Sequence, residues 1–145
     1  MNAYMNQYHN NHILNASSEQ ILIMLYDGAI RFTRQAVLGI EENKPSMKLE
    51  GISRAMAIIA EFSNTLDREV GGEIADSLDG LYHFMMRELT AARSESSVAR
   101  LRVVEDLLLD LRSTWAEAIE INRKESHSDV VASDDDNRSR LAVSM

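Results

Sequence analysis

Residues 17–45 have the sequence SSEQILIMLYDGAIRFTRQAVLGIEENKP. Ser17, followed three positions later by Gln20, forms the pattern of a capping box, in which two residues satisfy free backbone N–H groups at a helix start. Apolar residues then recur at helical spacing as far as Asn43, Lys44 and Pro45, where proline interrupts a continuing helix. The stretch therefore predicts a helix that begins at Ser17 and ends near residue 42.

Similar breaks divide the rest of the chain into three further predicted helices. We expect one over residues 45–70, ended by the pair Gly71-Gly72, and one over residues 73–93, ended by a serine-rich stretch. Serines of that stretch can cap a last helix, which reaches about residue 124. Four helices with short connections predict an all-α protein, folded as an antiparallel up-down four-helix bundle.

Two segments flank this predicted domain of residues 17–124. Residues 1–16 are polar and rich in asparagine, so we expect a flexible N-terminal segment. Residues 125–145 are rich in serine and aspartate and contain no aromatic residue, so we expect a disordered acidic tail.

The composition limits the classes of protein to which the chain can belong. Six glycines and one proline in 145 residues argue against an all-β fold, and the absence of cysteine excludes disulfides and cysteine-bound metals. The 15 Lys and Arg against 23 Asp and Glu give a net charge of -8, which argues against nucleic-acid binding. The longest apolar run, residues 21–26, is too short to span a membrane. The polar N-terminus has no basic region followed by an apolar one, so we expect no secretory signal. We therefore expect a cytoplasmic protein without membrane insertion.

A step of about 100° per residue places one apolar stripe on each predicted helix, and we expect these stripes to form the core. They consist of Ile21, Leu22, Leu25, Ala29, Phe32 and Ala36, then Leu49, Ile52, Met56, Ile59 and Leu66, then Ile74, Leu78, Leu81, Met85 and Leu89, and finally Leu101, Val104, Leu108, Leu111 and Trp115.

Further apolar residues lie about 90–110° away from these stripes, and we call them the apolar shoulders. They are Ile23, Tyr26, Ile30 and Val37 on the first helix, Ile58 and Phe62 on the second, and Val103, Leu107 and Ile121 on the fourth. Large apolar patches on soluble proteins usually mark partner sites, so the shoulders predict a binding groove. Two alternatives stay open, because a broad core could absorb some of these residues or a homodimer could cover them.

The sequence contains few residues in a pattern typical of catalysis or metal binding. A di-iron bundle needs Glu-x-x-His pairs, but His83 has Gly80 three positions before it. His9 and His12 lie in the polar N-terminal segment without further ligands, and no nucleotide-binding or hydrolase motif occurs. We therefore expect no cofactor, metal or catalytic residue. The alternative is a histidine phosphotransfer domain that uses an exposed His83.

Several motifs together resemble the FliS family, the flagellin-specific export chaperones. They follow in the family's order and spacing over most of the chain. The motifs are Tyr8, Ile13 and Asn15-Ala16-Ser17; residues 20–24 with Leu25-Tyr26-Asp27-Gly28-Ala29; residues 66–75; Leu78-Asp79-Gly80-Leu81-Tyr82; and Val104-Glu105, Leu107-Leu108, Leu111 and Trp115.

The resemblance implies a function without catalysis. Members of this family bind the C-terminal region of new flagellin in the cytoplasm, prevent its early polymerisation and deliver it to the flagellar type III export gate. Such a flagellin segment is unfolded when free and forms amphipathic helices when bound, so it needs apolar grooves on a rigid partner. We expect the apolar shoulders to supply those grooves.

The N-terminal segment carries apolar Met5, Tyr8 and Ile13 although it is too polar to form a stable helix alone. We predict a lid, in which Tyr8 and Ile13 cover an apolar shoulder of the free protein until cargo displaces them. The resemblance implies that the freed Tyr8, with Met5 nearby, then engages the export gate. The alternative is a frayed terminus without contacts.

Overall fold

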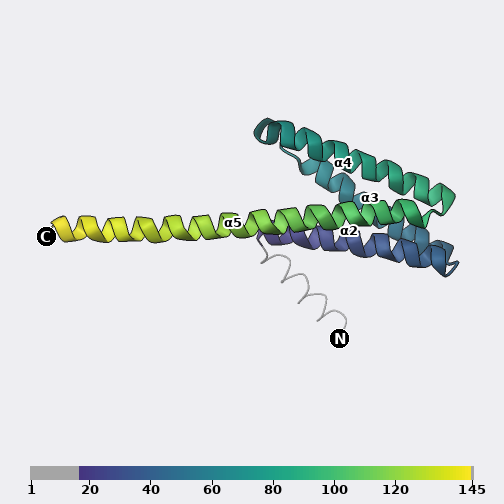
Figure 1. Ribbon diagram of the computed structural model, residues 1–145, viewed down its shortest axis with the longest axis horizontal. Helices are drawn as coiled ribbons and strands as arrows, with labels where there is room; N and C mark the ends of the chain where they lie inside the picture. The colour runs from purple at the N-terminus through teal and green to yellow at the C-terminus, as the bar shows by residue number, and fades with distance from the viewer. Residues whose placement is uncertain (1–16, 145) are drawn as a thin grey trace, which may run out of the picture. The chain divides into compact units, whose positions relative to one another are not determined.

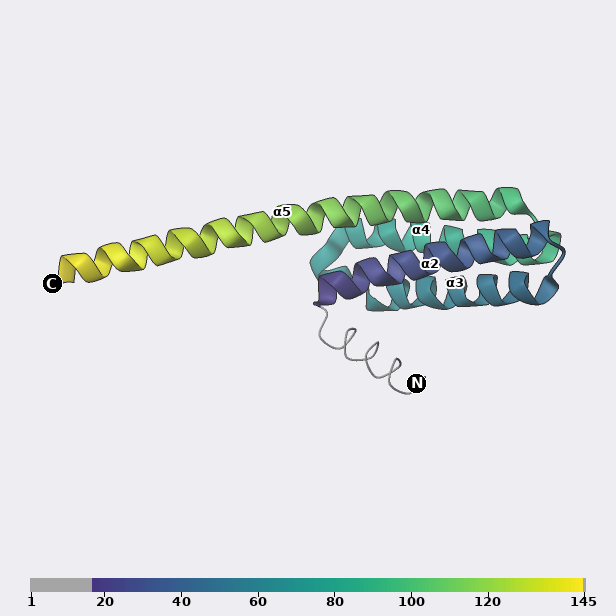
Figure 2. The same ribbon diagram turned by 90° about the horizontal axis from the view of Figure 1, so that it is seen from below.

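The computed structural model describes the backbone of residues 17–144 and the side chains of residues 17–67 and 69–126. Within this part of the chain it contains four helices and no strand, namely α2 (Ser18–Glu41), α3 (Pro45–Thr65), α4 (Arg68–Glu95) and α5 (Val98–Ser144). In both views α2, α3, α4 and the first part of α5 run in alternating directions (Figures 1 and 2). The predicted all-α, antiparallel up-down four-helix bundle is therefore confirmed.

The chain forms two compact units, Met1–Arg112 and Ser113–Met145. The first contains α2, α3, α4 and the start of α5, and the second contains the rest of α5. The predicted lid residues Met5, Tyr8 and Ile13 lie outside the described residues.

The start of α2 confirms the predicted capping box. The Gln20 backbone N–H donates to Ser17 Oγ at 3.1 Å, and the Ser17 N–H donates to Gln20 Oε1 at 3.1 Å. At the other end Asn43 has a φ of 55°, a left-handed conformation that asparagine tolerates better than most residues. Pro45 then begins α3, where its missing N–H removes no helical hydrogen bond.

The boundary between α3 and α4 differs from the prediction. We expected the glycine pair to end a helix at about residue 70, but α3 ends at Thr65 and α4 begins before the glycines. The physical reason is Asp67, whose Oδ1 accepts hydrogen bonds from the N–H groups of Glu69 and Val70, both at 3.1 Å, and so caps a new helix early. Gly72, with φ 53° and ψ -126°, produces a kink inside α4.

The start of α5 agrees with the prediction, but its end does not. Ser97 Oγ accepts a hydrogen bond from the Arg100 N–H at 3.2 Å, as expected of a capping serine. The backbone of α5 is helical to Ser144, so this helix runs past the end that we expected near Lys124. Serine and aspartate favoured an end there, but residues 125–144 contain neither glycine nor proline to break the helix.

Glycines let α2 and α3 approach each other very closely. A Cβ atom on Gly51 would lie 2.6 Å from the carbonyl oxygen of Phe32, and one on Gly39 would lie 2.5 Å from the backbone nitrogen of Lys48. Neither position has room for a larger residue, so the two backbones are nearly in contact at both points.

The buried core confirms part of the predicted stripes. The α5 residues Leu101, Val104 and Leu108 are buried, as are Met85 and Leu89 of α4. On α2 the structure confirms Ala29 and Ala36 of the predicted stripe, but the buried arc extends over the shoulder residues Tyr26, Ile30 and Val37. The other predicted core residues of this helix, Ile21, Leu22, Leu25 and Phe32, are only half-buried. Its buried residues are Tyr26, Gly28, Ala29, Ile30, Thr33, Ala36, Val37 and Gly39.

Candidate functional site

The structure places half of the predicted flagellin-binding residues in the core. Those with at most 4% of their surface exposed are Tyr26, Ile30, Val37 and Phe62. The other four remain at the surface: Ile23, Ile58 and Leu107 are half-buried, and Val103 is 41% exposed. The predicted groove is therefore corrected at the first four positions, and the alternative of a broader core holds there.

The physical reason is that α2 has a neighbour on several sides. Tyr26 contacts both α3 and α4, while Arg34 pairs with Glu105 of α5 at 3.1 Å and Asp27 pairs with Arg112 of α5. A helix surrounded in this way buries an arc wider than one stripe.

Three aromatic residues join α2, α3 and α4 inside the bundle. The rings of Tyr26 and Phe62 are stacked, with centroids 4.3 Å apart and planes at 20°. The Tyr82 ring lies 5.6 Å from that of Phe62, and its hydroxyl group is 2.8 Å from the Tyr26 hydroxyl. All three residues are buried, so this aromatic cluster is a structural element and presents no surface to a partner.

Beyond the aromatic cluster, large apolar side chains are incompletely covered. Leu66, one turn after Phe62, and Leu78, one turn before Tyr82, are only half-buried. Val70 and Ile74 of α4 are 85% and 71% exposed. We call this group of residues the apolar end, and it consists of residues 21–25 of α2, Leu66, Val70, Ile74 and Leu78.

The elements of the apolar end lie at one end of the bundle. The start of α2, the end of α3 and the start of α4 are found there in both views (Figures 1 and 2). Of residues 21–25, all apolar, Met24 is exposed and the others are half-buried. We expected Ile21, Leu22, Leu25, Leu66 and Ile74 in the core, but Ile74 is 71% exposed and the other four are half-buried.

The signal that could have located the apolar end was the glycine pair. Gly72 bends α4 at its second turn, and Val70 and Ile74 lie on either side of that bend. A helix bent near its start can leave the common axis of a bundle, so apolar residues flanking such a bend are candidates for exposure.

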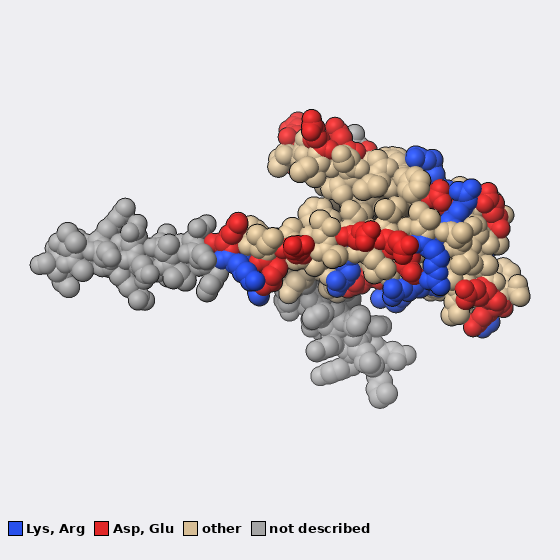
Figure 3. Space-filling model, viewed as in Figure 1, with Lys and Arg blue, Asp and Glu red and all other residues tan. Residues whose placement is uncertain are grey.

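Charged side chains lie along the helices outside the apolar end. Figure 3 shows acidic residues along α5 and at the start of α4. A hydrogen bond to Asp27 raises the pKa of the Arg112 guanidinium, and hydrogen bonding to Glu95 raises the pKa of Arg100, so both arginines stay charged at physiological pH. The first pair links α5 to α2 and the second links α5 to α4, so both connect neighbouring elements of the bundle.

Two chemical alternatives can be compared with the described residues: a metal site and a phosphotransfer site at His83. Among the described residues no three His, Asp or Glu side chains come together as a metal site. His83 is exposed, as predicted, and its Nδ1 lies 2.8 Å from the backbone oxygen of Asp79, while Ser63 Oγ donates to the Asp79 carboxylate at 2.6 Å. No helix in the described part of the chain has the length and apolar character needed to cross a bilayer.

Comparison with known proteins assigns the chain to a family. The family model described as "Flagellar protein FliS" matches residues 1–122. The chain belongs to the FliS family. Its similarity to the flagellar secretion chaperone FliS of Bacillus subtilis is 32% identity over 120 residues, which cover 83% of this chain and 89% of that protein.

Other FliS proteins are similar at the same level. The flagellar secretion chaperone FliS of Salmonella typhimurium is 36% identical over 104 residues, covering 71% of this chain and 77% of that protein. A crystal structure of a flagellar chaperone from bacteria matches the fold with a TM-score of 0.67, at 20% identity, over 81% of this chain and 96% of that one. Because FliS proteins are flagellar secretion chaperones and the family is not one of enzymes, the phosphotransfer alternative through His83 is not supported.

Proposed function

We propose that the chain is a cytoplasmic chaperone that binds the C-terminal segment of flagellin, keeps it from polymerising and delivers it to the flagellar type III export gate. Membership of the FliS family supports a role in flagellar export. The structural observation that carries the proposal is the apolar end, where Val70 and Ile74 are largely exposed.

The physical argument rests on the cost of leaving that surface in water. Burying apolar surface contributes roughly 25 cal/mol per Å², so side chains such as Ile74 favour a partner that covers them. An unfolded cargo segment that forms amphipathic helices on binding would cover these side chains. The apolar surface that it buries offsets the conformational entropy that the segment loses when it folds. The bundle offers a rigid surface for this, because the aromatic cluster holds three helices together.

The proposed contact surface revises the predicted one. Ile23 belongs to the apolar end, and Ile58, Val103 and Leu107 remain candidates for contact with other parts of the cargo because they are not fully buried. Val70 and Ile74 are added because of their exposure.

The N-terminal lid stays part of the proposal because of where the segment is attached. It joins α2 at Ser17, beside residues 21–25 of the apolar end. An extended chain spans at most about 3.5 Å per residue, so the four residues from Ser17 to Ile13 can reach about 14 Å and the nine to Tyr8 about 30 Å. Both side chains therefore have the reach to cover the apolar end before cargo arrives, and the displaced Tyr8 and Met5 then engage the export gate.

The test is calorimetric titration of the full chain with a peptide of the flagellin C-terminal segment. Ile74→Asp places a charge on the apolar end, and we expect it to weaken binding at least about tenfold because the charge must be desolvated in the complex. Leu49→Asp is the matched control, since Leu49 is 45% exposed and lies at the start of α3, at the other end of the bundle. Both variants should keep the helical circular dichroism of the parent. Equal binding by Ile74→Asp and the parent would contradict the proposed surface.

A further inference from the structure

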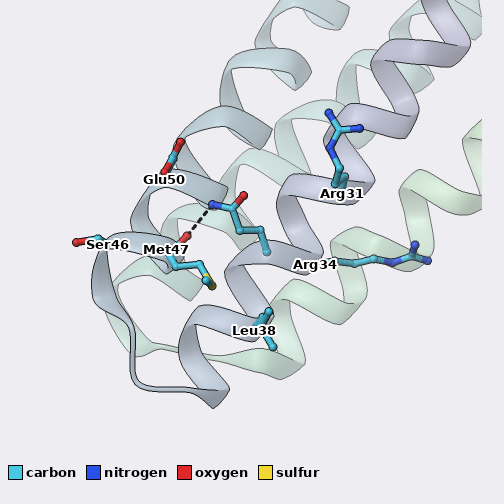
Figure 4. Close-up of a pocket in the computed structure, with 7 residues that line it drawn as sticks. Arg31, Arg34, Leu38, Ser46, Met47 and Glu50 are labelled. Carbon is cyan, nitrogen blue, oxygen red and sulfur yellow. Dashed lines mark hydrogen bonds between the residues drawn. The ribbon is translucent and has the colours of Figure 1, made fainter. Parts of the chain in front are cut away.

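A second surface lies between α2 and α3, away from the apolar end. The second half of α2 and the first turns of α3 form an open cleft with a volume of about 610 Å³ (Figure 4). Its principal lining residues are Arg31, Arg34 and Leu38 of α2 and Ser46, Met47 and Glu50 of α3.

Two arginines, Arg31 and Arg34, line the cleft with one carboxylate, Glu50, which pairs with Arg54 at 3.1 Å. The cleft is therefore locally positive although the whole chain carries a net charge of -8. Arg31 has no ion pair among the described residues, and its guanidinium lies 5.2 Å from the centroid of the Phe32 ring. The Arg54 guanidinium lies 5.5 Å from the same ring. The contact with the Phe32 ring orients the Arg31 guanidinium without neutralising its charge.

The second arginine of the cleft is only partly neutralised. Arg34 Nε lies 3.1 Å from Glu105 Oε2, but Arg102 Nη1 lies at the same distance from that oxygen. One carboxylate therefore serves two guanidinium groups, and the Arg34 side chain is 57% exposed. The local excess of positive charge leaves Arg34 able to bind a further anion.

The other end of the cleft is apolar. Leu38 is exposed and Met47 is half-buried, and the Gln35 amide donates to the Met47 backbone oxygen at 3.2 Å, which links the two helices beneath them. In Figure 4, Leu38 and Met47 lie on facing helices, and Arg31 lies farther along α2. Arg31 and Leu38 are seven residues apart, which corresponds to about 10.5 Å along a helix.

We infer that this cleft is a docking site for an acidic amphipathic helix of a protein partner, separate from the surface proposed for flagellin. A partner helix with an apolar residue and a carboxylate two turns apart matches the spacing of Leu38 and Arg31. Such a helix is repelled by the acidic remainder of the surface and attracted to this cleft, so the charge pattern gives specificity. The apolar end consists of residues at the start of α2, the end of α3 and the start of α4, and it shares no residue with the cleft, so both sites can be occupied at once.

The test uses two synthetic 18-residue helical peptides with the same leucine positions, one flanked by glutamate and the other by lysine. Fluorescence anisotropy with the full chain at low salt should show binding of the glutamate peptide and at least about tenfold weaker binding of the lysine peptide. Arg31→Glu should weaken binding of the glutamate peptide about tenfold, and Leu38→Ser should weaken it severalfold. Arg87→Glu on α4 makes the same charge change on an arginine outside the cleft, and it should change the affinity less than twofold.

Three results would overturn the inference. The first is that the glutamate peptide does not bind at low salt. The second is that Arg31→Glu and Arg87→Glu weaken binding of this peptide equally, because binding would then depend on the net charge of the protein and not on the cleft. The third is displacement of the bound glutamate peptide by the flagellin segment, which would make the cleft part of the cargo surface. Thermal unfolding of each variant checks that the bundle is intact. These measurements use no flagellin except in the displacement experiment. A flagellin titration that shows no binding would therefore contradict only the proposed function, and the two proposals are tested separately.

Discussion

The hydroxyl groups of Tyr26 and Tyr82 lie 2.8 Å apart inside the bundle, although 56 positions separate the two residues in the chain. Phe62 stacks on Tyr26 and lies close to Tyr82, so a single cluster connects α2, α3 and α4. This arrangement turns the predicted shoulder of α2 inward and leaves the first turns of α2 and α4 as the apolar surface.

The burial of the predicted shoulder residues determines which charge substitutions the bundle tolerates. An apolar residue at the surface would tolerate substitution by aspartate, but Phe62 and Ile30 are buried. Phe62→Asp and Ile30→Asp should therefore unfold the bundle, because each places an unpaired carboxylate in the core. The loss of helical circular dichroism at room temperature measures this. Val103→Asp is the control, because Val103 is 41% exposed and its substitution should retain the parent signal. A folded Phe62→Asp variant would show that the cluster is not required.

The close approach of α2 and α3 predicts opposite effects for two glycine substitutions. Gly51→Ala forces a Cβ atom against the Phe32 carbonyl, so it should lower the free energy of unfolding by about 1–3 kcal/mol. Gly80 lies in α4, and a Cβ atom added there would meet no atom within 4 Å, so Gly80→Ala should raise the free energy of unfolding by up to about 1 kcal/mol through helix propensity. Urea denaturation of both variants measures the difference. An equal effect at the two sites would contradict the packing described for α3.

Removal of residues 126–145 should leave both folding and flagellin affinity nearly unchanged. The first compact unit ends at Arg112, the family match ends at residue 122, and the removed segment contains no aromatic residue to bury. We expect changes below about 1 kcal/mol in the free energies of unfolding and of binding, which is the range of neutral changes. Urea denaturation and calorimetry of the truncated chain give both values, and a larger loss in either would assign the segment a structural or binding role.

Deletion of residues 1–16 tests the lid. The proposal requires that flagellin binding stays the same or tightens, because a competitor for the apolar end is gone, while binding to the export gate is lost. Calorimetry with the flagellin segment and pull-down with the gate protein measure the two effects. Tyr8→Ala should reproduce the gate defect alone, and Tyr4→Ala is its control. Weaker flagellin binding with retained gate binding would rule the lid out.

Short-range chemistry in the sequence predicts where several helices begin. Ser17 caps α2 through Gln20 three residues away, Pro45 begins α3, and Ser97 caps α5 through Arg100. These interactions involve residues within one helical turn, so they do not depend on the rest of the fold. The order of the motifs likewise predicts the family.

The tertiary structure decides which apolar residues are inside. Tyr26 and Leu25 are adjacent and both apolar in character, but Tyr26 faces Phe62 and Tyr82 while Leu25 stays half-buried at the apolar end. Periodicity gives the angle between two faces of a helix but not the number of neighbours each face meets. The number of neighbours depends on contacts between residues far apart in the chain and on the early start of α4, which Asp67 caps. The core face of α2 and the exposed surface proposed to bind cargo therefore follow from packing alone.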